Sequence, residues 1–185
     1  MAITINGNGT ISGYTPTTIS GTLSGSNMPS GSIIQTVVGT NGYSTSAQVD
    51  LTGSVSSPTF LDSNCKVTIT PIFSNSKICI IWSAQLRVAN SSKAFVGVYY
   101  SPNSDMSSPT VIEKSRGSNN NLDEAYRIND DTYTTWASWS RIAWDETISN
   151  TNTRYYNIGG YAASGNAYYG DNGVALQIMA QEIKV

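Results

Sequence analysis

Apolar and polar residues alternate along most of the chain from residue 32 onward, and this pattern predicts β-strands. The clearest run is 77–88, where each even position is apolar, namely Ile78, Ile80, Trp82, Ala84, Leu86 and Val88. A period of two places one side of a strand on a core. Comparable strands are predicted at 32–38, 48–53, 65–73, 94–101, 109–114, 133–144, 154–162 and 174–185. Short strands at this spacing predict an all-β fold, an antiparallel sandwich of the jelly-roll type, with a barrel as the alternative.

Two local features refine this picture. The strands at 65–73 and 77–88 are expected to form a hairpin across the short polar turn between them. The segment 115–131 has no alternation and is rich in Asn and Asp. We expect a surface loop there, which could hold one turn of helix at 122–126.

The first 31 residues follow a different pattern and are expected to form an extended segment before a domain at 32–185. The phrase Thr-Ile-Ser-Gly at 10–13 recurs at 18–21, and again at 22–25 with leucine, and the first charged residue is Asp50. One apolar residue in four cannot build a core within a single chain. Contacts with identical chains along an axis would bury these side chains. The candidates for these oligomer and attachment contacts are Ile3, Ile5, Ile11, Ile19 and Leu23.

Composition narrows the class of protein. Only 12% of residues are charged and the formal net charge is -2, so no basic patch predicts a nucleic-acid partner. Ser, Thr, Asn, Gly and Tyr fill the deficit, as is typical of extracellular β-proteins. We find neither a secretory signal nor a transmembrane run and expect no membrane insertion. Release in a particle by lysis is the expected route outside, and a mature or truncated chain is the alternative.

The two cysteines are expected to be free thiols. The alternation places Cys65 on the core side of its strand and Cys79 on the side away from the core. Cysteines on opposite faces of a hairpin cannot reach disulfide geometry.

The sequence offers little catalytic chemistry, and we predict a protein that is not an enzyme and has no cofactor or metal. The chain has no histidine, which removes histidine-based nucleophilic triads and zinc sites. Three adjacent acidic pairs, at 123–124, 130–131 and 145–146, could serve a glycosidase but are expected to be solvating groups. The order Asn129-Asp130-Asp131 is far from a calcium-loop motif.

Aromatic residues gather in the last third of the chain. Because both sides of the strand 133–144 carry aromatic or apolar residues, one side is expected to face the core and the other a subunit interface. Alternatively, some rings stack on sugars. Tyr168 and Tyr169 lie between glycine-rich turns and are candidates at a loop tip, although a simple hairpin turn is the other interpretation. The candidate receptor-binding residues are Trp139, Asn166, Tyr168, Tyr169 and Asp171.

Several of these segments resemble the short tail-fibre proteins of tailed phages, notably those of aquatic bacteria. The resemblance lies in Ile3-Thr4-Ile5-Asn6-Gly7-Asn8-Gly9-Thr10-Ile11-Ser12-Gly13, Pro29-Ser30-Gly31-Ser32-Ile33-Ile34-Gln35, Val67-Thr68-Ile69-Thr70-Pro71, Ser76-Lys77-Ile78, Trp144-Asp145-Glu146, Asn152-Thr153-Arg154-Tyr155-Tyr156 and Leu176–Ile183. It implies a homotrimeric fibre with an N-terminal attachment segment and a C-terminal β-sandwich that contacts the host. The family supplies no catalytic residues. This chain departs from it at Cys79, where an apolar residue is usual, and at 115–131, which has no counterpart.

The resulting hypothesis is a virion structural protein, a phage tail fibre that mediates host-cell adsorption. Its expected location is the virion tail, and its expected partners are sister copies, other phage tail proteins and a host surface glycan or protein. The alternatives are a capsid-decoration or other virion structural protein, a carbohydrate-binding module, and a glycanase acting on surface polysaccharide.

Overall fold

The computed structural model of the chain describes residues 28–39, 42–43, 49–54, 56–62, 65–88, 93–112, 123–127, 135–146, 148–169 and 175–185. Within these ranges, only the backbone is described for 42–43, 85–86, 88, 93, 123–127, 135–139, 163 and 175. The described residues form strands and turns, with no helix among them.

The first sheet is built around β6 (Lys77–Val88), the longest strand of the described chain. On one side β6 pairs along its whole length with β10 (Thr135–Asp145). On its other side lie β13 (Ala175–Ile183) and then β12 (Ala167–Tyr169). Beyond these come β1 (Ile33–Val38) and β2 (Gly42–Tyr43), which both pair with β13, and β3 (Val49–Asp50), which pairs with β12.

The second sheet is built around β11 (Arg154–Ser164) and β7 (Lys93–Ser101), which pair with each other. The outer side of β11 pairs with β4 (Thr59–Phe60) and β5 (Lys66–Ile69). The outer side of β7 pairs with β8 (Thr110–Val111) and β9 (Asp123–Arg127). The strand pairs of the described residues are antiparallel throughout both sheets.

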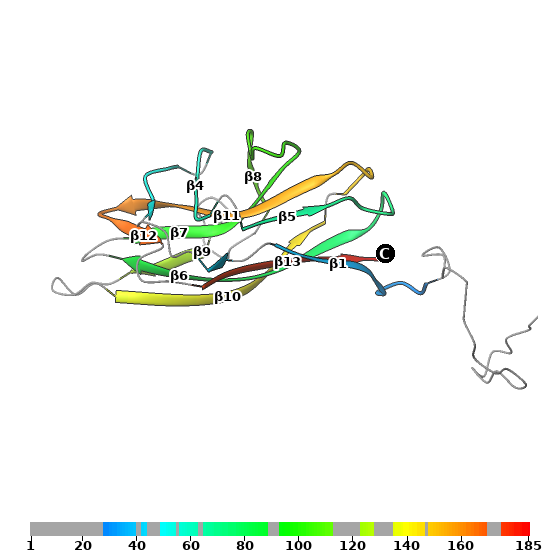
Figure 1. Cartoon of the computed structure of the whole chain (residues 1–185), viewed down its shortest axis with the longest axis horizontal. Helices are drawn as coiled ribbons and strands as arrows, with labels where there is room; N and C mark the ends of the chain where they lie inside the picture. Colours follow the sequence, from blue (N-terminus) through cyan, green and yellow to red (C-terminus); the bar gives the residue numbers. More distant parts are fainter. Residues whose placement is uncertain are drawn as a thin grey trace, which may run out of the picture.

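The two sheets lie face to face in a sandwich (Figure 1). The inward side chains of both sheets form one buried core, which includes Val67, Ile80, Trp82, Val98, Tyr156, Ile158 and Ile178. The predicted all-β antiparallel fold class is therefore confirmed. β6 contributes its apolar even positions to this core, since Ile78, Ile80, Trp82 and Ala84 are all buried.

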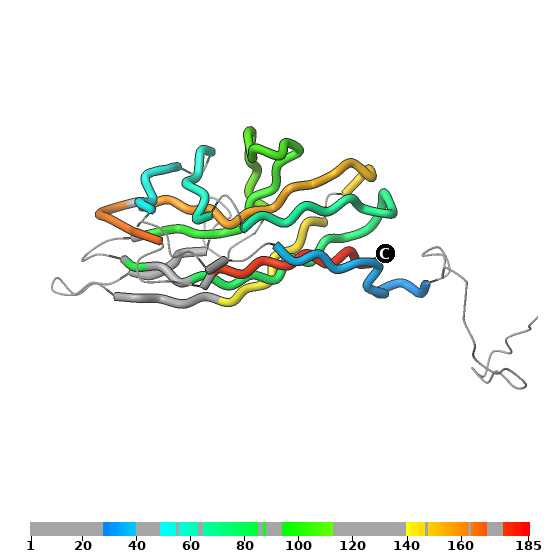
Figure 2. Tube along the Cα trace, in the orientation of Figure 1, coloured from blue at the N-terminus to red at the C-terminus, as the bar shows by residue number. Residues whose placement is uncertain are grey.

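The described start of the chain lies beside its end. Figure 2 shows β1 running along β13. Just outside these strands, the amide of Gly31 donates to the carbonyl oxygen of Lys184 at 2.8 Å, and the amide of Lys184 donates to that of Ser32 at 2.9 Å. The described chain therefore begins at the edge of the first sheet.

The expected hairpin of 65–73 with 77–88 is wrong. β5 pairs with β11 in the second sheet, whereas β6 belongs to the first sheet. The turn at 70–76 carries the chain from one sheet to the other. Alternation showed correctly which side of each strand is apolar, but it carries no information about the strand partner.

Two segments expected to be loops contain strands. β9 lies within 115–131, so the loop assignment fails there and the possible helical turn at 122–126 is wrong. β12 includes Tyr168 and Tyr169, which were expected at a loop tip. The backbones of β9 and β12 pair with longer neighbours, β7 and β6 respectively. This pairing makes them strands although their own sequences lack a clear strand pattern.

Candidate interaction surface

The outward side of the first sheet carries an apolar row that crosses four strands. Val38 of β1 lies opposite Met179 of β13, Met179 opposite Ile81 of β6, and Ile81 opposite Ile142 of β10. Val38 is 66% exposed and Ile142 is 58% exposed. Facing residues on antiparallel strands share one side of the sheet, so these four side chains form a continuous stripe.

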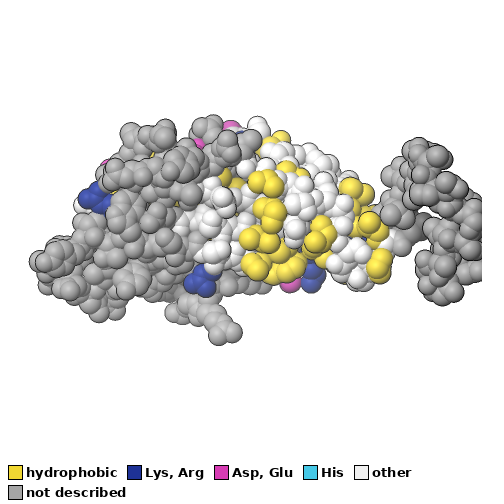
Figure 3. All heavy atoms as spheres, turned by 60° about the horizontal axis from the view of Figure 1, so that its bottom comes forward, with side chains coloured by type: hydrophobic (Ala, Val, Ile, Leu, Met, Phe, Trp, Pro, Cys, Tyr) yellow, Lys and Arg dark blue, Asp and Glu magenta, His cyan; other side chains and the backbone are white. Residues whose placement is uncertain are grey.

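Two further rows extend the stripe into a surface that we call the outer face. One row joins Thr36, Gln181, Cys79 and Trp144, and the next joins Ile33, Ile183 and Lys77. Trp144 is 45% exposed and Ile33 is 50% exposed. Figure 3, in which this layer is turned toward the viewer, shows hydrophobic side chains gathered on the described part of the molecule.

Charge is confined to the rim of the outer face. Lys77 in the last row lies 3.3 Å from the carboxylate of Glu146, and both side chains are well exposed. The other members of the three rows carry no formal charge. An apolar centre with a polar rim is the usual anatomy of a protein interface.

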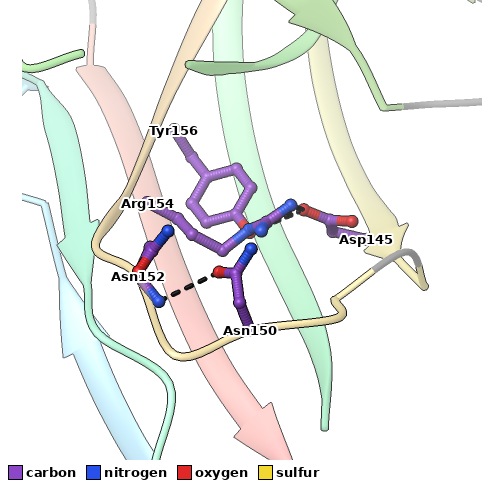
Figure 4. Close-up of polar contacts among 5 residues, drawn as sticks. All are labelled: Asp145, Asn150, Asn152, Arg154 and Tyr156. Atoms are coloured by element: carbon purple, nitrogen blue, oxygen red, sulfur yellow. Dashed lines mark hydrogen bonds and ion pairs between the residues drawn. The ribbon is translucent and has the colours of Figure 1, made fainter. Parts of the chain in front are cut away.

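A buried ion pair holds the end of β10 that carries Trp144. Arg154 of β11 donates from Nε and Nη2 to Asp145 Oδ2, at 3.2 and 2.8 Å, and the hydroxyl of Tyr156 donates to the same oxygen at 2.8 Å (Figure 4). The guanidinium also lies 4.1 Å from the ring centroid of Tyr100. Because successive strand residues point to opposite sides, anchoring Asp145 inward keeps Trp144 outward.

Burial favours the protonation states that this cluster needs. Burial together with the nearby Asp145 carboxylate raises the pKa of the Tyr156 phenol well above its ordinary value of 10.0. Burial alone would lower the pKa of the Arg154 guanidinium, but the neighbouring Tyr156 and Asp145 outweigh it and raise that pKa. A neutral tyrosine and a charged arginine therefore both persist at neutral pH.

A second buried carboxylate, that of Glu182, holds the turn at 70–76, which connects β5 to β6. Glu182 of β13 is fully buried. It accepts hydrogen bonds from the amides of Ile72 and Phe73, from the Ser76 hydroxyl at 2.6 Å, and from Gln35 Nε2 at 2.6 Å. Several donors on one carboxylate offset the cost of burying it. Glu182 thereby joins β1, β13 and the turn that leads into β6.

Both cysteines are free and buried in this structure. Cys65 lies in the core, whereas Cys79 lies on the outer face, opposite Trp144, as the alternation predicts. Burial, with a contribution from Asp62, raises the pKa of the Cys65 thiol from 9.0 to about 11, and burial also raises that of Cys79. Thiols of this kind are poor nucleophiles.

The candidate receptor-binding residues do not form one displayed group. Tyr169 is fully buried, so its ring is not available to a receptor and the expected display of both tyrosines is wrong. Tyr168 is half-buried, and its ring centroid lies 5.7 Å from the guanidinium of Arg87. Asn166 is exposed in the short connection before β12. The strand period explains the difference, since adjacent residues in β12 face opposite sides.

The remaining predicted residues have no described side chain. Trp139 lies in β10 with its backbone opposite Ala84, and its side chain is outside the description. Asp171 lies outside the described residues, as do the attachment candidates Ile3, Ile5, Ile11, Ile19 and Leu23 and the segment Asn129-Asp130-Asp131.

The sequence analysis missed an aromatic cluster on the outward side of the second sheet. Phe95 and Tyr161 stack with centroids 5.2 Å apart, and Phe60 meets Tyr99 edge-on at 5.9 Å. Tyr155 joins the same cluster. The aromatic residues at odd positions of β7 and β11 could have indicated this cluster in the sequence. Both strands carry aromatic residues on their outward side as well as on their core side.

No protein-family model matches the sequence, and no curated protein matches it significantly. In the part of the chain that the structure describes, no helix is long and apolar enough to cross a membrane. The same residues contain no group of three or more acidic or cysteine side chains placed to hold a metal ion.

Proposed function

We propose that this chain is a structural protein of a phage particle, a tail fibre that assembles from several identical copies and mediates adsorption to the host cell. The observation that carries the proposal is the combination of two uncharged features. The first 49 residues carry no charged side chain, and from β1 onward they belong to a sandwich whose outer face has an apolar centre. The resemblance to short tail fibres supplies the biological setting.

In this proposal, residues 1–31 attach the fibre to the tail and the sandwich contacts the host. Each contact with a surface glycan or protein can be weak, because several copies on one particle raise the effective concentration. Tyr168 and Asn166 remain candidates for such a contact.

A carbohydrate-binding module is the second candidate, and a specific observation favours it. Tyr155 and Tyr161 are only partly buried on the outward side of the second sheet. Half-exposed aromatic rings on a rigid sheet suit stacking on sugar faces. A capsid-decoration protein or another virion component shares the structural role but not the adsorption.

Immunogold labelling of intact particles distinguishes these functions. We expect antibodies against the full chain to label the tail tip and to reduce adsorption of the particles to host cells. Label distributed over the capsid would instead indicate a decoration protein. A chain that binds immobilised glycans and is found on no particle would indicate a secreted binding module.

A further inference from the structure

We infer that the outer face of the first sheet is the surface on which this chain contacts a second copy of itself. The inference rests on the proposed oligomeric fibre and deepens it by naming the contact surface. The face consists of the three rows defined above, across β1, β13, β6 and β10.

The chemistry of the face suits a partner that is itself uncharged. Val38, Ile142 and Trp144 would lose contact with water on association, which is favourable for apolar surface. The first two rows would desolvate no ion, because their members carry no formal charge. A copy of the same face meets this requirement, and so does the charge-free segment 1–31 of that copy.

The position of the described N-terminus supports a second copy as the occupant. Residues 1–27 join the domain at Met28, whose carbonyl oxygen accepts a hydrogen bond from Lys184 Nζ at 2.5 Å. Met28 is therefore next to the end of β13 and leads into β1, the strand at the edge of the face. Copies that associate through this face would bring their uncharged segments together at one end.

The face by itself is smaller than a lasting interface requires. Four strands about 4.8 Å apart and rows about 7 Å apart give an area of roughly 400 Å², which is in the range of the largest apolar patches on monomers. A stable interface buries about 800 Å² on each partner. The face is thus about half of what a lasting contact needs, and the uncharged segments of the associating copies would supply the remainder.

The test is the mass of the full chain in solution, measured by light scattering after size exclusion. We expect a multiple of the chain mass for the unmodified protein, and one chain mass for Ile142→Asp and for Val38→Asp. Ile72→Asp is the matched control, because Ile72 is 56% exposed in the turn before β6 and lies outside the face. It should keep the oligomer. Circular dichroism of each variant should match that of the unmodified protein.

Cross-linking gives a second measurement on a folded chain. Ser140 is exposed and lies next to the apolar row, opposite Ser83. Ser140→Cys should give cross-linked dimers with a bismaleimide reagent, whereas Ile72→Cys should not, and the buried native cysteines contribute little background.

The outcomes separate the two proposals. If Ile142→Asp and Val38→Asp both retain the oligomer, the face is not the contact, while the oligomeric fibre stands. If the unmodified chain is a monomer at all concentrations, the inference and the oligomeric fibre both fail, including the case in which its own N-terminal segment covers the face. Loss of tail-tip labelling with an intact oligomer would overturn the proposed function alone.

Discussion

Arg154 of β11 donates two hydrogen bonds to a single carboxylate oxygen of Asp145 in β10, and so links the two sheets through the core. Both side chains are almost completely buried. The pair fixes the position of β10 relative to the second sheet and, through the strand alternation, the outward position of Trp144.

Asp145→Asn should lower the free energy of unfolding by about 3 to 5 kcal/mol, because it leaves the Arg154 charge buried without its counter-ion. Urea denaturation measures this. The double variant Asp145→Leu with Arg154→Met should lose less than the sum of the two single variants, since no charge then remains buried. Additive losses would show that the two side chains act independently.

Glu182→Gln should lower the free energy of unfolding by about 1 to 3 kcal/mol, because an amide nitrogen would replace an oxygen that accepts hydrogen bonds from buried donors. Glu146→Gln is the matched control. It makes the same chemical change in an exposed ion pair with Lys77, where we expect a loss below about 1 kcal/mol. Equal losses in the two variants would contradict the role given to Glu182.

Tyr169→Ala should destabilise the domain by about 3 to 5 kcal/mol, because it empties a large buried site. Tyr169→Phe should change stability by less than about 1 kcal/mol, since the buried hydroxyl has no hydrogen-bond partner among the described residues. Thermal unfolding distinguishes the two.

Adsorption should therefore be tested with Tyr168→Ala alone, because a change at Tyr169 would also affect folding. A folded Tyr168→Ala variant with unchanged adsorption would remove Tyr168 from the receptor site.

Stability should fall as the pH rises above about 9. Folding raises the pKa of Cys65 from 9.0 to about 11 and the pKa of the Tyr99, Tyr156 and Tyr169 phenols above 10.0. Above the ordinary pKa, the unfolded chain loses these protons first and is stabilised. Cys65 alone should account for about 2 kcal/mol by pH 11.

Urea denaturation at pH 8, 9.5 and 11 checks the alkaline loss. Cys65→Ala should reduce the loss of stability between pH 8 and 9.5, where the thiol contributes more than any single tyrosine. Constant stability from pH 8 to 11 would show that these groups titrate alike in the folded and unfolded chain.

Much of the fold could be predicted because alternation is a local property. The run 77–88 matches β6 in both bounds, and its even positions from Ile78 to Ala84 form part of the core. The same alternation placed Cys79 away from the core and predicted an apolar second side for the strand that became β10. The exposed Ile142 and Trp144 are consistent with that second side.

The candidate site was harder to predict because it combines distant strands. Val38 and Ile142 belong to one row only because Met179 and Ile81 lie between them. Tyr168 and Tyr169 looked alike in sequence, yet a two-residue pairing with β6 buries one and leaves the other half-exposed.

The sequence by itself determined that this protein is all-β with an uncharged leading segment, since the period of two and the absence of charge are properties of consecutive residues. Only the tertiary structure decided which strands are neighbours, that β5 and β6 belong to different sheets, and that one apolar row crosses the outer face. The physical reason is that backbone hydrogen bonds between strands are the same for every residue type. Partners are therefore selected by the packing of the whole core and by buried groups such as Asp145 and Glu182.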